Sequence, residues 1–360
     1  MKKLSFILFI SMINIELLAW GERGHDLIAR VAIRLLRYKK MPHAMRRPFE
    51  KREHMLGHLA NCPDIAWKQL PRKVTHFINP THWIGLDHLS KNPDLKLMPK
   101  NIGEFLNLVH LKEPLISSKE SLDVQKLKII GSAPFRVEEL SHKAITIFKK
   151  KINSRITKEQ SNEILLYLGL LAHYVGDLAN PHHTVSDYDS WKAKQGGLHA
   201  YFESALVNSL SLGLDYAVFK EAKENKPAQK IINTLENKNK RNNLMLTWAL
   251  VIDSYQNYPR LLKLDRDYAL IKESKYERGM KIRATRKNPY EVNQYFKDFI
   301  IQRLALAADL LSHIWILTWL AGGKVDQSHF HSYKYFYKPK LLIPSYYPPT
   351  LKQEILSNLK

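Results

Sequence analysis

The chain has 360 residues, of which 45% are hydrophobic, and 56 Lys and Arg against 34 Asp and Glu give a net charge of +22. This size can bury a large core, while the single cysteine, Cys62, excludes an internal disulfide. A charge of this sign favours phosphate-rich partners such as nucleic acid, nucleotides or anionic lipid, although it can also reflect solubility in the native compartment.

The first 19 residues are typical of a removable signal peptide. Two lysines precede an apolar run over 4–15, and Leu-Leu-Ala ends the segment at Ala19. Cleavage after Ala19 makes Trp20 the first residue, so we expect a secreted or periplasmic protein. No later stretch has the roughly 20 consecutive apolar residues of a membrane span.

Helical spacing of apolar residues dominates the rest of the chain, and strand signals are nearly absent. We therefore expect an all-α, single multi-helix domain over 20–323. An aromatic and proline-rich tail over 324–360 should lie extended on its surface. The periodicity predicts helices at 26–36, 102–112, 135–152, 158–180, 198–210 and 292–320.

The helix at 158–180 carries the clearest functional pattern. His173 and Asp177 are four residues apart and therefore lie on one helix face. Pro181 ends the helix and two histidines follow, and His199 and Glu203 then repeat the four-residue spacing. Imidazole and carboxylate groups presented in this way are typical zinc ligands.

The remaining candidates are less specific when each is taken alone. His25 lies close to Trp20, Asp64 follows a proline and can equally be a helix N-cap, and His76 stands in a short apolar segment. The His199 and Glu203 pair can be an ordinary exposed helix pair. Further histidines are available for accidental patterns, and His182 is a direct rival of His183; these further histidines are His54, His58, His82, His88 and His182.

The motifs taken together resemble a known family. They are Trp-Gly-x-x-Gly-His at 20–25, Pro-Asp-Ile at 63–65, His-Phe-Ile at 76–78, His-x-x-Gly-Asp-x-x-x-Pro-x-His at 173–183 and His-x-x-x-Glu at 199–203. This set resembles the zinc-dependent single-strand-specific nucleases of the S-one/P-one type and their relatives, the zinc-dependent phospholipases C. The resemblance extends from Trp20 to Glu203, and more weakly over 300–322. It implies an all-helical fold with three zinc ions, so that the multi-helix domain would enclose a trinuclear zinc cleft.

The resemblance also implies the ligands. One zinc ion would be held by Asp64, His76, His173 and Asp177. The second would be held by His25, by the amine and carbonyl of Trp20, and by Asp177 as a bridging carboxylate. The third would be held by His183, His199 and Glu203. Removal of the signal peptide would free the Trp20 amine, which can bind metal only when it is deprotonated.

Such a site predicts phosphodiester hydrolysis with Asp64 and Asp177 as catalytic residues. Two zinc ions about 3.5–4 Å apart can activate a shared water as the nucleophile. We therefore expect hydrolysis of single-stranded DNA or RNA, and of 3′-nucleotides. The resemblance places Phe77 where an aromatic ring stacks a base, although this residue can equally belong to the core.

Two features bear on the substrate. The five-residue step from Trp20 to His25 resembles the nucleases, whereas His199-x-x-x-Glu203 resembles the phospholipases. The alternative is a phospholipase C acting on anionic or choline phospholipid head groups, although 204–360 does not predict a lipid-binding β-sandwich. A second alternative is a non-catalytic basic binding protein with structural zinc. No obligate protein partner is indicated.

Overall fold

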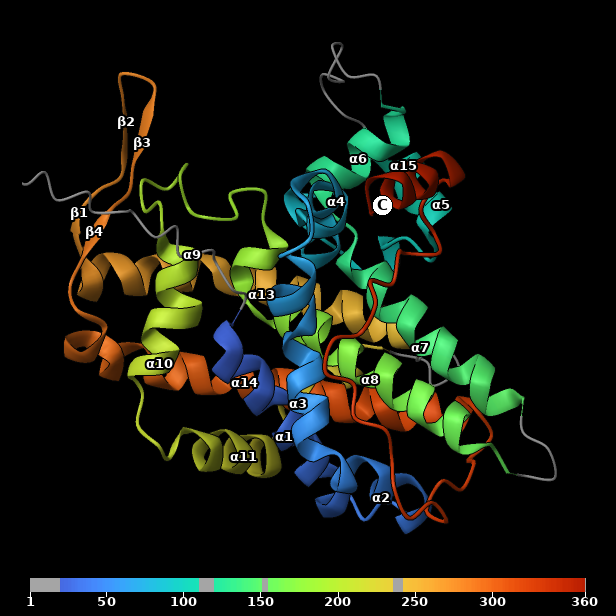
Figure 1. The fold of residues 1–360 in the computed structure, drawn as a ribbon. Helices are drawn as coiled ribbons and strands as arrows, with labels where there is room; N and C mark the ends of the chain where they lie inside the picture. The colour runs from blue at the N-terminus through green and yellow to red at the C-terminus, as the bar shows by residue number, and fades with distance from the viewer. Residues whose placement is uncertain (1–19, 110–119, 151–154, 236–241, 360) are drawn as a thin grey trace, which may run out of the picture.

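The computed structural model describes residues 20–109, 120–150, 155–235 and 242–359. Over these residues the protein is predominantly all-α, with 69% of the residues in helices and 4% in strands (Figure 1). This confirms the expected all-α class. The predicted signal segment and its cleavage site before Trp20 lie outside, or at the edge of, the described residues.

The longer helices in chain order are α1 (Gly21–Tyr38), α2 (His43–Lys51), α3 (Glu53–Cys62), α4 (Arg72–Ile78), α5 (Ile102–Leu108), α6 (Leu122–Ile130), α7 (Ala133–Lys149), α8 (Lys158–Ala179), α11 (Leu214–Asn225), α12 (Pro227–Asn233), α13 (Asn243–Leu264), α14 (Pro289–Ala321) and α15 (Pro349–Leu359). Short helical turns connect them: η1 (Pro63–Trp67), η2 (Asn79–His82), η3 (Leu86–His88), η4 (Leu95–Leu97), η5 (Pro181–Thr184), α9 (Leu198–Ala200), η6 (Tyr201–Leu206), α10 (Val207–Ser209) and η8 (Asp265–Ala269).

Helix α8 lies at the centre of the fold. Its N-terminus is closed by a capping box, in which Thr157 and Gln160 satisfy each other's backbone N–H groups. Its C-terminal half is buried on every side, because α3, α7, α13 and α14 all pack against it. The helix ends before Pro181, as its sequence predicts, and the two histidines that follow are themselves buried.

Helix α14 is the second central element. Its length and its mean hydropathy of 1.6 over the most apolar part would suit a membrane span, but 72% of that part is buried inside the protein. It packs against α1, α8 and α11, and Trp315 donates a hydrogen bond to the carbonyl of Leu168 at 3.2 Å. The apolar character of α14 therefore serves the core of the described structure.

Two small antiparallel strand pairs depart from the sequence expectation. Strands β1 (Leu270–Lys272) and β4 (Thr285–Arg286) form the base of an arm, and β2 (Lys275–Glu277) pairs with β3 (Met280–Ile282) at its tip. Arg278 and Gly279 have positive φ values of 48° and 79°, as a tight hairpin turn requires. The arm projects from the helical body beside α9 (Figure 1).

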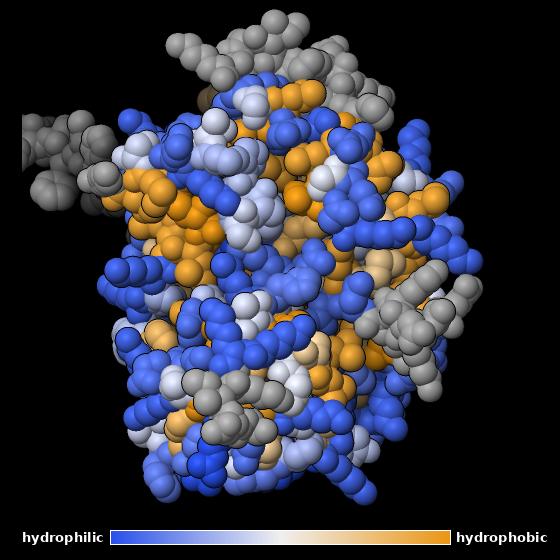
Figure 2. All heavy atoms as spheres, turned by 90° about the vertical axis from the view of Figure 1, so that its right-hand side faces the viewer, coloured by the Kyte–Doolittle hydropathy of each residue, from blue (hydrophilic) through white to orange (hydrophobic). Residues whose placement is uncertain are grey.

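The C-terminal tail follows the surface in extended form, as expected, but it ends in a helix. Trp67 donates a hydrogen bond to the carbonyl of Pro339, and the hydroxyl of Tyr347 donates one to the carbonyl of Phe77. Helix α15 then packs on α4. The face that includes α7 carries separate hydrophobic patches between hydrophilic side chains (Figure 2).

Candidate metal centre

Three groups of buried imidazole and carboxylate side chains meet around the C-terminal half of α8 in the described part of the chain. Within each group the candidate ligand atoms lie within 4.8 Å of one another. The groups are His25, Asp64 and His173; His82, His173 and Asp177; and His183, His199 and Glu203. Each group could hold a metal ion.

His82, rather than His76, joins Asp64, His173 and Asp177. The Nδ1 atom of His82 lies 2.9 Å from Nε2 of His173 and 3.1 Å from Oδ2 of Asp177. The Asp64 Oδ1 atom lies 3.7 Å from this His82 nitrogen. Four ligand atoms from η1, η2 and α8 thus converge on one point.

His76 is therefore a wrong assignment. Helix α4 turns its apolar face, which includes Val74 and Ile78, into the core, and this leaves His76 exposed. Partial burial and the nearby Lys128 lower the pKa of His76. The sequence signal for His82 is weak: it closes a short turn that begins at Asn79-Pro80, much as His183 follows Pro181.

The carboxylate of Asp177 has the geometry of a bridging ligand. Its Oδ2 atom lies 3.1 Å from both His82 Nδ1 and His173 Nε2, whereas its Oδ1 atom lies 3.4 Å from Nε2 of His25. The His25 and His173 rings stack with 4.3 Å between centroids. Gly176 permits this approach, because a Cβ atom there would lie 2.7 Å from Nδ1 of His25.

The third group lies around Glu203. Its Oε2 atom is 2.8 Å from Nε2 of His199 and 3.6 Å from Nε2 of His183, and these two nitrogens are 3.0 Å apart. The rival residue His182 is not part of this group: its ring stacks on that of His199, and its Nε2 atom lies 3.2 Å from the hydroxyl of Ser190. The structure thus brings the three predicted residues together.

Backbone carbonyls select the tautomers of two of these histidines. The Nδ1–H of His173 donates to the carbonyl of Ala60, and that of His183 donates to the carbonyl of His82, both at 2.8 Å. The Nε2 lone pair of each ring is therefore free and points into its group. This is the outer-shell arrangement that orients metal-bound histidines.

Two further polar residues support the groups and were missed by the sequence reasoning. The side-chain amide of Asn180 donates to Oε2 of Glu203 at 2.8 Å, and the ammonium of Lys68 lies 2.6 Å from Oδ1 of Asp64. Lys68 lies one helical turn after Asp64, a spacing that could have suggested the contact. The turn η1 that carries Asp64 is π-helical, a conformation frequent at functional sites.

The pKa values of the carboxylates in these groups favour the ionised form, which binds cations. Burial would raise the pKa of Asp177, but His173 and His183 lower it well below its ordinary value. Burial likewise opposes ionisation of Glu203, yet His199 and His183 lower its pKa. Burial lowers the pKa of His82 to about 4, so this ring is neutral near pH 7. Burial would also lower the pKa of His173 and of His183, but the charge of Asp177 raises both. A metal ion at these groups would take the place of the protons on these two rings, because metals bind neutral imidazole.

The donor set fits a metal of the zinc type. Ligands about 2.0–2.1 Å from a tetrahedral zinc ion lie about 3.3 Å from one another, close to the separations given above. Both ring nitrogens of His25 and the Oε1 atom of Glu203 are buried without a hydrogen-bond partner among the described residues. Buried polar groups are almost always satisfied, and a bound ion would satisfy these.

Trp20 contacts the part of α8 that carries Asp177. Its buried ring contacts Phe202, and its indole N–H donates to the carbonyl of Gly176, the residue before Asp177, at 2.6 Å. Its own carbonyl accepts a bond from the N–H of Gly24 at 3.1 Å. The side chain therefore fixes the start of α1 beside the bridging carboxylate.

Phe77 does not present a free stacking face. Its side chain is buried in the core cluster, and the Lys128 ammonium lies over the ring, 4.0 Å from the centroid. The helix α4 that turns His76 outward turns Phe77 inward. The assignment of Phe77 as a substrate-stacking residue is therefore wrong for this structure.

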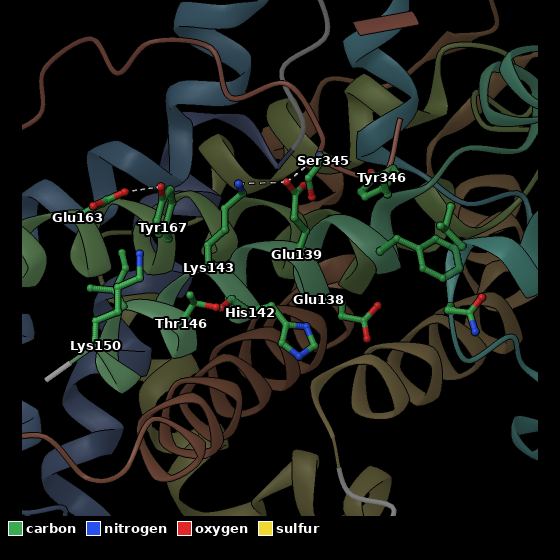
Figure 3. Close-up of a pocket in the computed structure, with 14 residues that line it drawn as sticks. Glu138, Glu139, His142, Lys143, Thr146, Lys150, Glu163, Tyr167, Ser345 and Tyr346 are labelled. Carbon is green, nitrogen blue, oxygen red and sulfur yellow. Dashed lines mark hydrogen bonds and ion pairs between the residues drawn. The ribbon is translucent and has the colours of Figure 1, made fainter. Parts of the chain in front are cut away.

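A hollow along α7 is separate from these groups. Its lining includes the carboxylates of Glu138, Glu139 and Glu163, with Lys143 bound to Glu139 and Tyr167 bound to Glu163 (Figure 3). None of the candidate metal ligands lines it.

No family model matches the chain, and no curated protein matches it in sequence. The geometry of the three groups therefore carries the functional argument.

Proposed function

We propose that the protein is a zinc-dependent phosphodiesterase that hydrolyses single-stranded DNA or RNA, and 3′-nucleotides, with three zinc ions. The observation that carries this proposal is the placement of Asp177, one oxygen of which faces His82 and His173 while the other faces His25. A carboxylate shared in this way suits two metal ions close together, the arrangement that phosphoryl hydrolysis uses.

Zinc ions bound here would supply Lewis acidity for a phosphoryl oxygen and lower the pKa of a bound water. The residues of the protein would hold the metal ions and orient the substrate phosphate. Asp64 and Asp177 provide negative charge between imidazoles whose tautomers are set by backbone carbonyls. The Lys68 ammonium lies at the edge of the group and can offset the charge of a phosphate. Near-complete burial of the ligands strengthens each of these interactions.

The charge of the chain supports nucleic acid as the substrate. A net charge of +22 attracts a polyanion over distances beyond direct contact. The phospholipase alternative is favoured by one observation: His199 and Glu203 form the ligand pair that resembles the phospholipases, at 2.8 Å. In either case we infer export, since the resemblance requires a free amine at Trp20.

A paired assay tests the choice. Purified zinc-loaded protein should release acid-soluble nucleotides from single-stranded DNA and should release little phosphocholine from phosphatidylcholine vesicles. Release of phosphocholine without release of nucleotides would contradict the nuclease proposal and support the phospholipase C alternative. Metal analysis separates both from a binding protein, because fewer than two zinc ions per chain would exclude the proposed hydrolysis.

The mature N-terminus is tested by mass spectrometry of the exported protein. We expect a chain that begins at Trp20. A chain that retained earlier residues would lack a free amine beside His25 and would contradict this part of the proposal.

A further inference from the structure

A second hollow opens between the loop that follows η5 and the β2–β3 arm. It encloses about 630 Å³, and its lining includes Tyr188, Trp191, Tyr276, Lys281 and Arg283. This volume lies within the range of ordinary ligand pockets. In Figure 1 the arm and the loop that precedes α9 lie side by side at the edge of the helical body.

Aromatic rings and cations alternate along this hollow. The Trp191 and Tyr276 ring centroids are 5.5 Å apart, and the Lys281 ammonium lies 5.1 Å from the first and 5.8 Å from the second. Tyr276 is 62% exposed, so its ring is available to a ligand. Rings that can stack bases, with cations between them, suit a single strand of nucleic acid.

The acidic residues of the hollow are engaged by the loop itself. Asp189 accepts a hydrogen bond from the indole N–H of Trp191 at 2.9 Å. Asp187 accepts bonds from the backbone N–H groups of Lys192 and Ala193, at 3.0 and 3.2 Å. These carboxylates hold the loop and the Trp191 ring in place, whereas Lys192 and Arg283 are exposed.

The arm is joined to the loop by main-chain contacts. Ser274 donates its N–H to the carbonyl of Lys194 at 2.8 Å, and Ala284 donates to the carbonyl of Gly196 at 3.0 Å. Gly196 also packs directly on Trp191, since a Cβ atom there would lie 2.7 Å from the ring. The arm and the loop therefore form one pre-arranged surface, which reduces the entropy lost on binding.

The hollow borders the candidate metal centre through Tyr188. The Tyr188 ring lies in the hollow and stands at 90° to the His199 ring, with 4.8 Å between centroids. His199 belongs to the third ligand group. Tyr188 is thus the residue that a strand would pass between the metal centre and Trp191 and Tyr276.

We propose that the loop and the β2–β3 arm form a subsite for the part of a single-stranded nucleic acid that extends beyond the metal centre. Tyr276 stacks a base on its exposed ring, Trp191 supports that ring from the loop, and Lys281 and Arg283 contact the neighbouring phosphates. This inference rests on the proposed function for the direction of the strand, but binding to the subsite can be measured without hydrolysis.

The test measures binding of the zinc-loaded protein to a fluorescent oligothymidylate of about 12 nucleotides, a length within the range of single-strand sites, with a phosphorothioate backbone that slows cleavage. Tyr276→Ala should weaken binding about tenfold, as loss of one stacked base predicts, and Trp191→Ala should also weaken it, because the Trp191 ring supports that of Tyr276. Lys281→Glu should weaken binding and reduce its salt dependence. Trp191→Phe should restore most of the affinity.

Two matched controls separate the subsite from general effects. Met280→Ala changes an equally exposed hairpin residue and should leave binding unchanged. Zinc content and hydrolysis of bis(p-nitrophenyl) phosphate, which is too small to reach the arm, should be unchanged in all variants. Loss of either in Trp191→Ala would mean that the arm supports the metal centre, and the subsite would be rejected.

The remaining outcomes are also decisive. Wild-type affinity in Trp191→Ala and Tyr276→Ala, or equal affinity for an abasic oligonucleotide, would overturn the stacking subsite. If the protein bound the oligothymidylate through Trp191 but cleaved no nucleic acid, the proposed nuclease function would fail and the subsite would stand. Cleavage of single-stranded DNA with unchanged binding in every arm variant would overturn the subsite and leave the proposed nuclease function in place.

Discussion

The Nδ1 atom of His82 lies 3.1 Å from Oδ2 of Asp177, although 95 residues separate them in the chain. This contact completes the ligand group around His173 and places a third imidazole against the bridging carboxylate. The contact predicts that His82 is a metal ligand, whereas the sequence motif predicts His76 in that role.

Substitution of these two histidines should have opposite results. His82→Ala removes a buried ligand and should lower both zinc content and phosphodiesterase activity, the activity by more than the roughly 10–100-fold typical of outer-shell changes. His76→Ala removes an exposed side chain and should change activity by no more than about twofold. Metal analysis and steady-state kinetics check both. Loss of zinc in His76→Ala but not in His82→Ala would show that His76 is the ligand, as the motif predicts.

Metal removal should destabilise the folded protein. Without ions, Asp64, Asp177 and Glu203 are buried carboxylates that depend on neighbouring imidazoles and Lys68 for compensation, and such burial costs several kcal/mol per ion. Thermal unfolding after treatment with a chelator should therefore occur at a lower temperature. Zinc should restore the transition, whereas magnesium should not, because imidazole ligands favour zinc. An unchanged melting temperature would contradict a structural role for the metals.

Asn180 should control the third ligand group specifically. Its amide holds Oε2 of Glu203, so Asn180→Ala should weaken binding of one metal ion about 10–100-fold while leaving the others in place. Competition with a chromophoric chelator measures this affinity. Asn162→Ala, which removes a buried asparagine that accepts a bond from the Lys334 N–H, is the matched control. Loss of all metal ions together in Asn180→Ala would show that the groups are not independent.

The half-buried Glu138 in the hollow of Figure 3 should make stability depend on pH. Burial raises its pKa from 4.5 to about 7. The folded state therefore binds a proton that the unfolded state releases between these values, and stability falls as pH rises through this window. Glu138→Gln should be neutral near pH 4 and should raise the unfolding free energy by about 1–2 kcal/mol near pH 8, after allowance for partial solvent screening.

Urea denaturation at several pH values checks this prediction. Glu163→Gln removes an exposed carboxylate from the same hollow and reveals the part of any effect that comes from net charge alone. An equal increase in unfolding free energy for both variants at every pH would contradict the prediction that the raised pKa of Glu138 controls the pH dependence.

Much of the fold and part of the centre could be predicted from the sequence. The helices α7, α8 and α14 follow apolar periodicity, and the pairs His173/Asp177 and His199/Glu203 follow from helix geometry over four residues. The β2–β3 arm could not be predicted in this way, because its strands are short and exposed and lack a buried face to impose alternation. Its one local signal is Arg278-Gly279, which supplies the turn.

Residue type and local spacing are enough to predict the chemistry of the ligands and the pairs that one helix presents. Tertiary packing is needed to explain why His82 enters the centre while His76 faces solvent and Phe77 faces the core. The reason is physical: burial of the apolar face of α4 sets its rotation, and that rotation is determined by packing partners that lie far away in the chain.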